Sequence, residues 1–164
     1  GFLHPEGVYD DPSGGILRTE LYPRLRLHFQ FQNGLNLFHE VAHREKFSIN
    51  IYGLRIPSAR FIHISNLFHP MTVDQSFAHD GSGICDGIKT EESVWSLNGH
   101  KDRLIDIGET ELGLFAELYD EVGTPPIQAR LPVIHSLTTT FGALATILDT
   151  ANRGSPANSL LKAR

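Results

Sequence analysis

The sequence contains very little cysteine: Cys85 is the only one in 164 residues. A disulfide framework within the chain is therefore excluded, and the composition suits a reducing compartment. Basic residues are also scarce, because 14 Lys and Arg stand against 19 Asp and Glu and leave a net charge of −5. A domain that binds nucleic acid alone usually has a strongly basic face. If DNA is a partner, most of the cationic surface must lie elsewhere.

Long apolar runs and common nucleotide or hydrolase motifs are absent as well. No stretch of about 18 apolar residues occurs, and the start lacks the basic-then-apolar order of a signal peptide. We therefore expect a cytoplasmic protein without a membrane partner. The patterns GxxxxGK[ST], GxGxxG and GxSxG do not occur. The apolar content of 40% is sufficient for one compact core.

Two runs in the first third alternate apolar and polar residues as β-strands do. They are LHFQFQN, residues 27–33, and FSINIY, residues 47–52. A period of two gives each run one apolar face and one polar face. The polar faces carry amides that bond across the strands or line a cleft. Shorter apolar runs predict further strands at residues 2–4, 61–64 and 104–107.

Helical spacing of apolar residues appears in three places. The first, residues 15–26, is ended or kinked near Tyr22 by Pro23, and its arginines, including Arg18, are expected in solvent. The others are residues 110–123 and residues 136–150. The predicted organisation is a first unit, a connector with short strands, a helical segment and a flexible tail, at residues 1–55, 56–108, 109–150 and 151–164.

The connection between the two alternating runs contains His39-Glu40-Val41-Ala42-His43. On a helix, two histidines four residues apart would bind zinc, and Glu40 would act as general base, as in HExxH peptidases. No third ligand is placed by the spacing, and strand character resumes just after Lys46. A zinc-dependent hydrolase that uses His39, Glu40 and His43 is therefore the alternative interpretation.

Longer strings in the chain point to a family. FLHPEGVYDDPSGG, LYPRLRLHFQFQN and KFSINIYG are followed by GHKDRLIDI and LFAELYDE. Together they resemble the bacterial restriction-modification DNA methyltransferases that are specific for adenine N6, across about residues 2–136. The resemblance implies an α/β fold: the C-terminal portion of a Rossmann-like class I methyltransferase sheet with an antiparallel hairpin of strands six and seven. A mixed region with helices follows it and connects to a target-recognition region.

The same resemblance assigns the segments and a site. It makes residues 2–4 the fifth strand, residues 16–26 the next helix and the two alternating runs the sixth and seventh strands. Phe38 matches the aromatic residue that stacks on the extruded adenine, which helps to recover the few kcal/mol lost when a base is flipped. Arg44 and Lys46 are candidates for contacts with the DNA backbone. Packing in the core is the competing role for Phe38.

Two motifs of these enzymes are missing from the chain. They are the glycine-rich cofactor loop and the Asn/Asp-Pro-Pro-aromatic catalytic motif, since the only Pro-Pro is Pro125-Pro126, preceded by Thr124. We therefore expect a fragment of a restriction-modification or related phage-defence enzyme that is inactive alone and binds no cofactor. S-adenosylmethionine would be bound by the full-length protein.

The expected partners follow from this assignment. They are DNA, through the full-length protein, and the missing N-terminal methyltransferase half. A sheet without that half exposes a strand edge, so self-association through the edge is expected. A non-catalytic interaction module is the remaining alternative.

Overall fold

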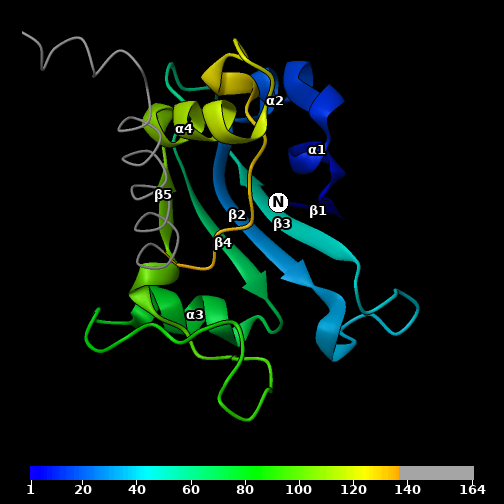
Figure 1. The fold of residues 1–164 in the computed structure, drawn as a ribbon, viewed down its shortest axis with the longest axis vertical. Coiled ribbons are helices and arrows are strands. Elements are labelled where there is room, and N and C mark those ends of the chain that lie inside the picture. The colour runs from blue at the N-terminus through cyan, green and yellow to red at the C-terminus, as the bar shows by residue number, and fades with distance from the viewer. Residues whose placement is uncertain (137–164) are drawn as a thin grey trace, which may run out of the picture.

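A computed structural model of the chain describes residues 1–136. It contains a five-stranded mixed sheet in the order β1-β3-β2-β4-β5 (Figure 1). The strands are β1 (Phe2–Pro5), β2 (Leu25–Gln32), β3 (Lys46–Tyr52), β4 (Phe61–Leu67) and β5 (Ile105–Ile107). β3 runs antiparallel to both β1 and β2, β4 runs parallel to β2, and β5 runs antiparallel to β4. The segment after residue 55 therefore contributes two strands to the same sheet as the first unit.

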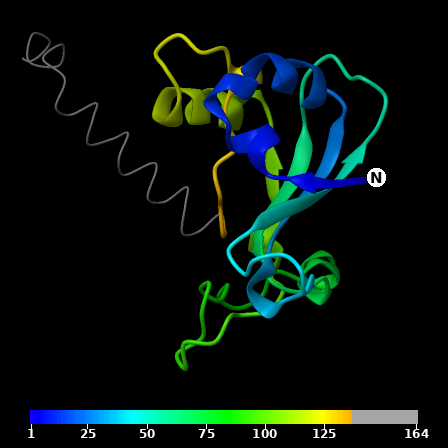
Figure 2. The same ribbon diagram turned by 90° about the vertical axis from the view of Figure 1, so that its right-hand side faces the viewer.

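Helices cover the two faces of the sheet unequally. The helices are α1 (Gly7–Asp10), α2 (Gly15–Leu21), α3 (Met71–Ala78) and α4 (Glu109–Tyr119), and the 3-10 turns are η1 (Pro12–Gly14), η2 (Asn33–Leu35), η3 (Lys101–Arg103) and η4 (Pro126–Gln128). In Figure 2, α1, α2 and α4 lie on one side of the sheet and α3 lies on the other. None of these helices is long and apolar enough to cross a bilayer, among the residues described.

Each face of the sheet has its own apolar cluster. Under α1, α2 and α4 the cluster contains Tyr9, Tyr22, Phe61 and Phe115, all fully or almost fully buried. The opposite face has a smaller cluster, made of Phe31, Phe47, Ile64 and Leu67. Because only the eight-residue α3 covers that face, Ile51 and Phe77 remain partly exposed there.

The alternating runs form the strands predicted for them, and β2 and β3 pair from Gln32–Lys46 to Leu25–Tyr52. The predicted strands at residues 2–4, 61–64 and 104–107 and the helix after residue 109 are also confirmed. The helix predicted at residues 15–26 is α2, which ends at Leu21, just before Pro23, as expected from the missing proline N–H. The helix predicted at residues 136–150 and the tail lie outside the described residues, apart from Ser136.

Three local features differ from the sequence predictions. α1 and α3 were not predicted, because each is short and has few apolar residues at helical spacing. Arg18 is not in solvent: its side chain is buried and donates to the carbonyls of Gln128 (2.9 Å), Val8 (3.2 Å) and Asp11 (2.8 Å). These bonds tie α2 to the segments on both sides of it.

Candidate functional site

The connection between β2 and β3 is a loop. After η2, residues 36–45 contain turns and bends and no helix. The helical spacing that would put His39 and His43 on one face is therefore absent, and both side chains are exposed. Within residues 1–136, no three His, Cys, Asp or Glu side chains gather as metal ligands do. The structure does not bring Glu40 and the two histidines into a zinc-binding arrangement.

Phe38 lies in this loop beside a small apolar cavity. Its ring meets the ring of Phe47 edge to face, with centroids 5.1 Å apart, and it is 43% exposed. The cavity has a volume of about 260 Å³ and is lined by Leu3, Pro5, Phe38, Val41 and Phe47, with Glu45 and Lys46 at its rim. Because β1 ends at Pro5 and β2 ends just before the loop, the cavity lies at the carboxyl ends of these two strands.

The chemistry of this cavity is simple. Its walls are aromatic and aliphatic, so a flat apolar ring system would be favoured over a charged group. Phe38 is more exposed than the neighbouring core aromatics Phe31 and Phe47, which are 2% and 9% exposed. The cavity, which we call the Phe38 pocket, therefore suits stacking of a planar ligand.

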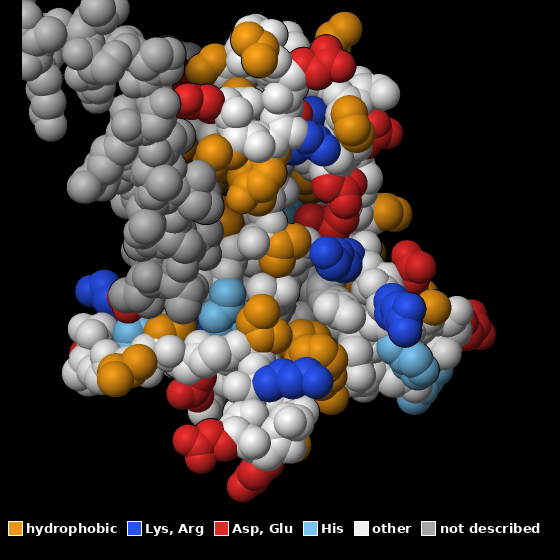
Figure 3. Space-filling view, viewed as in Figure 1, with side chains coloured by type: hydrophobic (Ala, Val, Ile, Leu, Met, Phe, Trp, Pro, Cys, Tyr) orange, Lys and Arg blue, Asp and Glu red, His pale blue; other side chains and the backbone are white. Residues whose placement is uncertain are grey.

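The two predicted backbone-contacting residues are on the same loop. Arg44 and Lys46 are both exposed. In Figure 3, histidine and basic side chains lie together over the region of this loop, with acidic side chains among them. The loop therefore offers isolated cations beside the Phe38 pocket rather than a continuous basic surface.

The polar sides of the central strands are buried. His28 and Gln30 of β2, Ser48 and Asn50 of β3, and His63 and Ser65 of β4 are each less than 5% exposed. Across the strands, His28 is opposite both Asn50 and His63, and Gln30 is opposite Ser48. The polar residues of the alternating runs thus face inward, under α1 and the chain near Ile134, whose carbonyl accepts from Ser65 Oγ.

Two histidines meet at the centre of this buried polar row. The Nδ1 atoms of His28 and His63 lie 2.7 Å apart, so one ring donates a hydrogen bond and the other accepts it. Glu6 Oε1 lies 3.3 Å from His28 Nε2, a close contact that is poorly aligned for a hydrogen bond. Nε2 of His63 has no hydrogen-bond partner among the described residues.

The surroundings set the charge of these groups. Burial lowers the pKa of His63 well below its ordinary value, and the neighbouring His28 lowers it further. For Glu6, burial raises the pKa, but interactions with His28, Ser48 and Gln30 outweigh burial and leave the pKa below its ordinary value. At neutral pH the row therefore holds the Glu6 carboxylate, which lies beside His28, and a neutral His63.

Tyr9 closes the buried row from α1. Its hydroxyl donates to Asn50 Oδ1 at 2.6 Å and lies 2.8 Å from the Tyr52 hydroxyl, and its ring packs edge-on against His28. Burial, followed by the contact with Tyr52, raises the pKa of Tyr9 far above its ordinary value. These buried groups contact one another, and the Phe38 pocket is not lined by them, so we interpret the row as internal structure.

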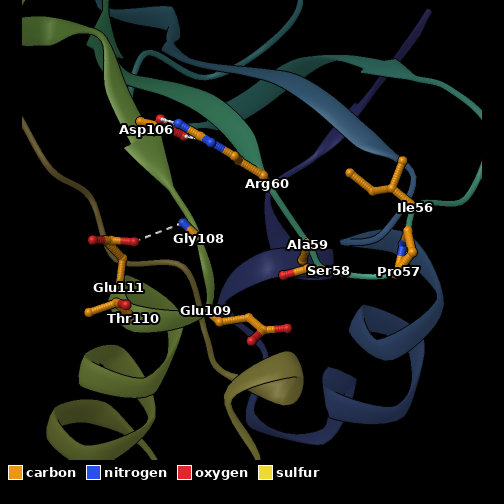
Figure 4. Close-up of a pocket in the computed structure, with 10 residues that line it drawn as sticks. All are labelled: Ile56, Pro57, Ser58, Ala59, Arg60, Asp106, Gly108, Glu109, Thr110 and Glu111. Carbon is orange, nitrogen blue, oxygen red and sulfur yellow. Dashed lines mark hydrogen bonds and ion pairs between the residues drawn. The ribbon is translucent and has the colours of Figure 1, made fainter.

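A hollow larger than the Phe38 pocket lies at another end of the sheet and has a volume of about 740 Å³ (Figure 4). It separates residues 56–60 from the start of α4. Arg60 and Asp106 point toward one another and form a pair at 2.6 Å, and the Gly108 N–H donates to Glu111. The cation of this hollow is paired with Asp106, and the start of α4 is capped by Glu111.

Sequence reasoning placed Phe38 but did not find the residue that holds its loop. Asn33 is fully buried and forms hydrogen bonds with Phe38 and Val41. In the sequence it is only the first residue of an Asn-Gly pair at the end of a strand, which gives no sign of these bonds. The buried polar row could have been found from the sequence, because the polar positions of the two alternating runs face one another when the runs pair. Comparison with family models, curated proteins and solved structures finds no match for the chain.

Proposed function

We propose that the chain is the C-terminal part of the catalytic core of a DNA adenine-N6 methyltransferase from a restriction-modification or related phage-defence system. In this proposal it contributes the pocket for the target base, with Phe38 as the stacking residue. The observation that carries the proposal is the open Phe38 ring above an apolar cavity at the carboxyl ends of β1 and β2. In open α/β sheets, ligands bind in crevices at the carboxyl ends of strands.

The arrangement of the first strands supports the proposal. In this proposal β1 is the fifth strand, and β2 and β3 form the antiparallel hairpin of strands six and seven. Here β3 pairs with β1 on one side and with β2 on the other, antiparallel to both. α2 lies between β1 and β2 in the chain, where the helix after the fifth strand is expected.

In this proposal the chain would position the target base and would not contribute catalytic groups. Phe38 would stack on an extruded adenine, and the aliphatic walls formed by Leu3 and Val41 would exclude water from it. Arg44 and Lys46 would approach phosphates of the same DNA, because they are exposed on the same loop. The catalytic motif and the S-adenosylmethionine site would belong to the other half of the full-length protein.

Adenosine is the direct probe of the pocket in the chain as it exists. A titration followed by NMR should shift the signals of Phe38, Val41 and Phe47. Phe38→Leu keeps an apolar side chain but removes the ring, and should weaken adenosine binding by at least about fivefold, since base–aromatic stacking contributes roughly 1–3 kcal/mol. The matched control is Phe77→Leu, which changes a half-exposed aromatic residue on α3. Equal adenosine affinity for wild type and Phe38→Leu would contradict the assignment.

S-adenosylmethionine gives a second, independent measurement. Because the cofactor loop is missing from the sequence, calorimetry on this chain should detect binding no tighter than the millimolar range. Micromolar affinity would mean that the chain contains a cofactor site and that the fragment has been assigned to the wrong part of the enzyme.

A further inference from the structure

Asn33 closes the loop that carries Phe38. It follows the last residue of β2, and its backbone N–H donates to the Glu45 carbonyl at 3.0 Å, just before β3 begins. The residue is fully buried although it lies at the base of an exposed loop. The two ends of the loop are therefore joined at Asn33.

The side chain of Asn33 then bonds to the inside of the loop. Its Oδ1 accepts from the Phe38 N–H at 3.0 Å, and its Nδ2 donates to the carbonyls of Phe38 at 2.9 Å and Val41 at 2.6 Å. Both Nδ2 hydrogens are thus used. The reversed amide would place its NH₂ against an N–H and its oxygen against two carbonyls, so the partners fix its orientation.

These bonds determine where the Phe38 ring can lie. Both backbone polar groups of Phe38 bond to one buried side chain, whereas the ring itself has one described aromatic contact, with Phe47. The neighbours His39 and Glu40 are exposed. Without the Asn33 side chain, Phe38 would keep the backbone bond from the Val41 N–H to its carbonyl and the edge-to-face contact with Phe47, but its own N–H would lose its partner.

We propose that Asn33 is the positioning residue of the Phe38 pocket: its amide holds the loop so that the Phe38 ring forms one wall of the cavity before any ligand arrives. The identity of the ligand, an adenine base, rests on the proposed function. The positioning of Phe38 by Asn33 does not. Fixing the ring in advance removes the ordering cost from the binding step, which is how preorganised sites gain affinity. Asn33 itself would not touch the base.

The experiment compares Asn33→Asp with Asn36→Gly in the full chain. Aspartate has nearly the same shape but lacks the two donors, and its charge would face two carbonyls. Asn36 has a left-handed backbone (φ 58°) that glycine adopts readily, and its Nδ2 lies 3.0 Å from Nδ1 of His39. Asn36→Gly therefore alters the same loop without changing the Asn33 bonds.

Two readouts are measured on each variant. The first is the nuclear Overhauser contact between the Phe38 and Phe47 rings, which should disappear in Asn33→Asp and persist in Asn36→Gly. The second is adenosine affinity, which should fall at least about tenfold in Asn33→Asp, because the loop would then have to be ordered during binding. A persistent ring contact in folded Asn33→Asp would overturn the inference.

The two proposals fail in different ways. If wild type binds no adenosine, the proposed function fails, while the ring contact still decides the role of Asn33. If Asn33→Asp does not fold, hydrogen exchange on the wild type replaces it. The Phe38 amide, bonded to Asn33 Oδ1, should exchange at least about tenfold more slowly than the exposed His39 amide, as a closed hydrogen bond requires. Equal exchange rates would overturn the inference.

Discussion

Single buried polar side chains determine much of the internal order of this protein. Arg103 is almost fully buried and donates to the carbonyls of Ser65 (2.9 Å), Asn66 (3.0 Å) and Asn98 (3.2 Å), and burial lowers its pKa. Arg18 likewise donates only to backbone carbonyls in the contacts described above. Both guanidinium groups thus hold neighbouring segments together through hydrogen bonds and not through ion pairs.

The buried histidine pair leads to a prediction about how the free energy of unfolding depends on pH. In the unfolded chain His63 takes up a proton below about pH 6.5, its ordinary pKa, whereas in the folded chain burial opposes protonation. The unfolded state therefore binds more protons, and the free energy of unfolding should fall as pH drops below about 6.5. Glu6, whose pKa is lowered, adds a further loss at pH values below its ordinary 4.5.

Urea unfolding at several pH values between about 8 and 5 measures this slope. His63→Gln should flatten it, whereas the matched control His43→Gln, an exposed histidine on the loop, should leave it unchanged. A wild-type free energy of unfolding that stays constant over this range would contradict a lowered pKa of His63 in the folded chain.

At the scale of elements, α3 depends on close contact with the chain that returns to the sheet. The segment around Gly99 passes directly against the end of α3: the Gly99 N–H donates to the Gln75 side chain at 3.0 Å, and the Thr72 hydroxyl donates to the Leu97 carbonyl at 2.7 Å. A Cβ atom at Gly99 would lie 2.4 Å from Ser76 N and from Gln75 Cβ. Only glycine permits this approach.

Gly99→Ala should therefore destabilise the protein by about 1–3 kcal/mol, because backbone atoms of α3 would have to move. Gly87→Ala is the matched control: its nearest atom to an added Cβ is the Lys89 carbonyl, at an ordinary 3.6 Å. Thermal unfolding of both variants checks this, and equal midpoints would mean that α3 shifts without loss of stability.

For the whole molecule, one edge of the sheet is open. β1 pairs with β3 along one side, and no other strand within residues 1–136 pairs with it. Leu3 and Phe2 on this strand are 57% and 66% exposed. An uncovered edge with exposed apolar side chains favours pairing with another chain. We therefore expect the chain to self-associate as its concentration rises.

Leu3→Lys tests this expectation, because a charged residue on an edge strand discourages pairing between chains. Sedimentation should show a larger species for wild type at high concentration and a monomer for the variant. The control is Leu54→Lys, which changes an exposed leucine outside the strands. Loss of association in both variants alike would point to general apolar attraction instead of the β1 edge.

From the sequence, the residues that form the strands could be predicted. Which face of the sheet the helices and loops cover could not be predicted as well. Alternation identified β2 and β3 and suggested that their polar sides bond across the strands or line a cleft, but it did not show that His28 and Asn50 are fully buried while Ile51 is partly exposed. Alternation reports two faces and not what packs on each of them, which depends on α1 and on residues near Ile134. For the candidate site, the resemblance predicts Phe38 as the stacking residue, and this stays a prediction; the Asn33 bonds arise from the folded path of the loop and have no periodic signature.

The order of the first residues has a kinetic consequence. β1 is a four-residue edge strand, and the residue after it is Glu6, which lies against His28. Edge strands open locally far more often than the whole domain unfolds. Local opening of β1 would move Glu6 outward and admit water to the histidine pair. The rate at which these imidazoles exchange protons with the solvent should therefore match the rate of local opening of β1 and not the rate of global unfolding.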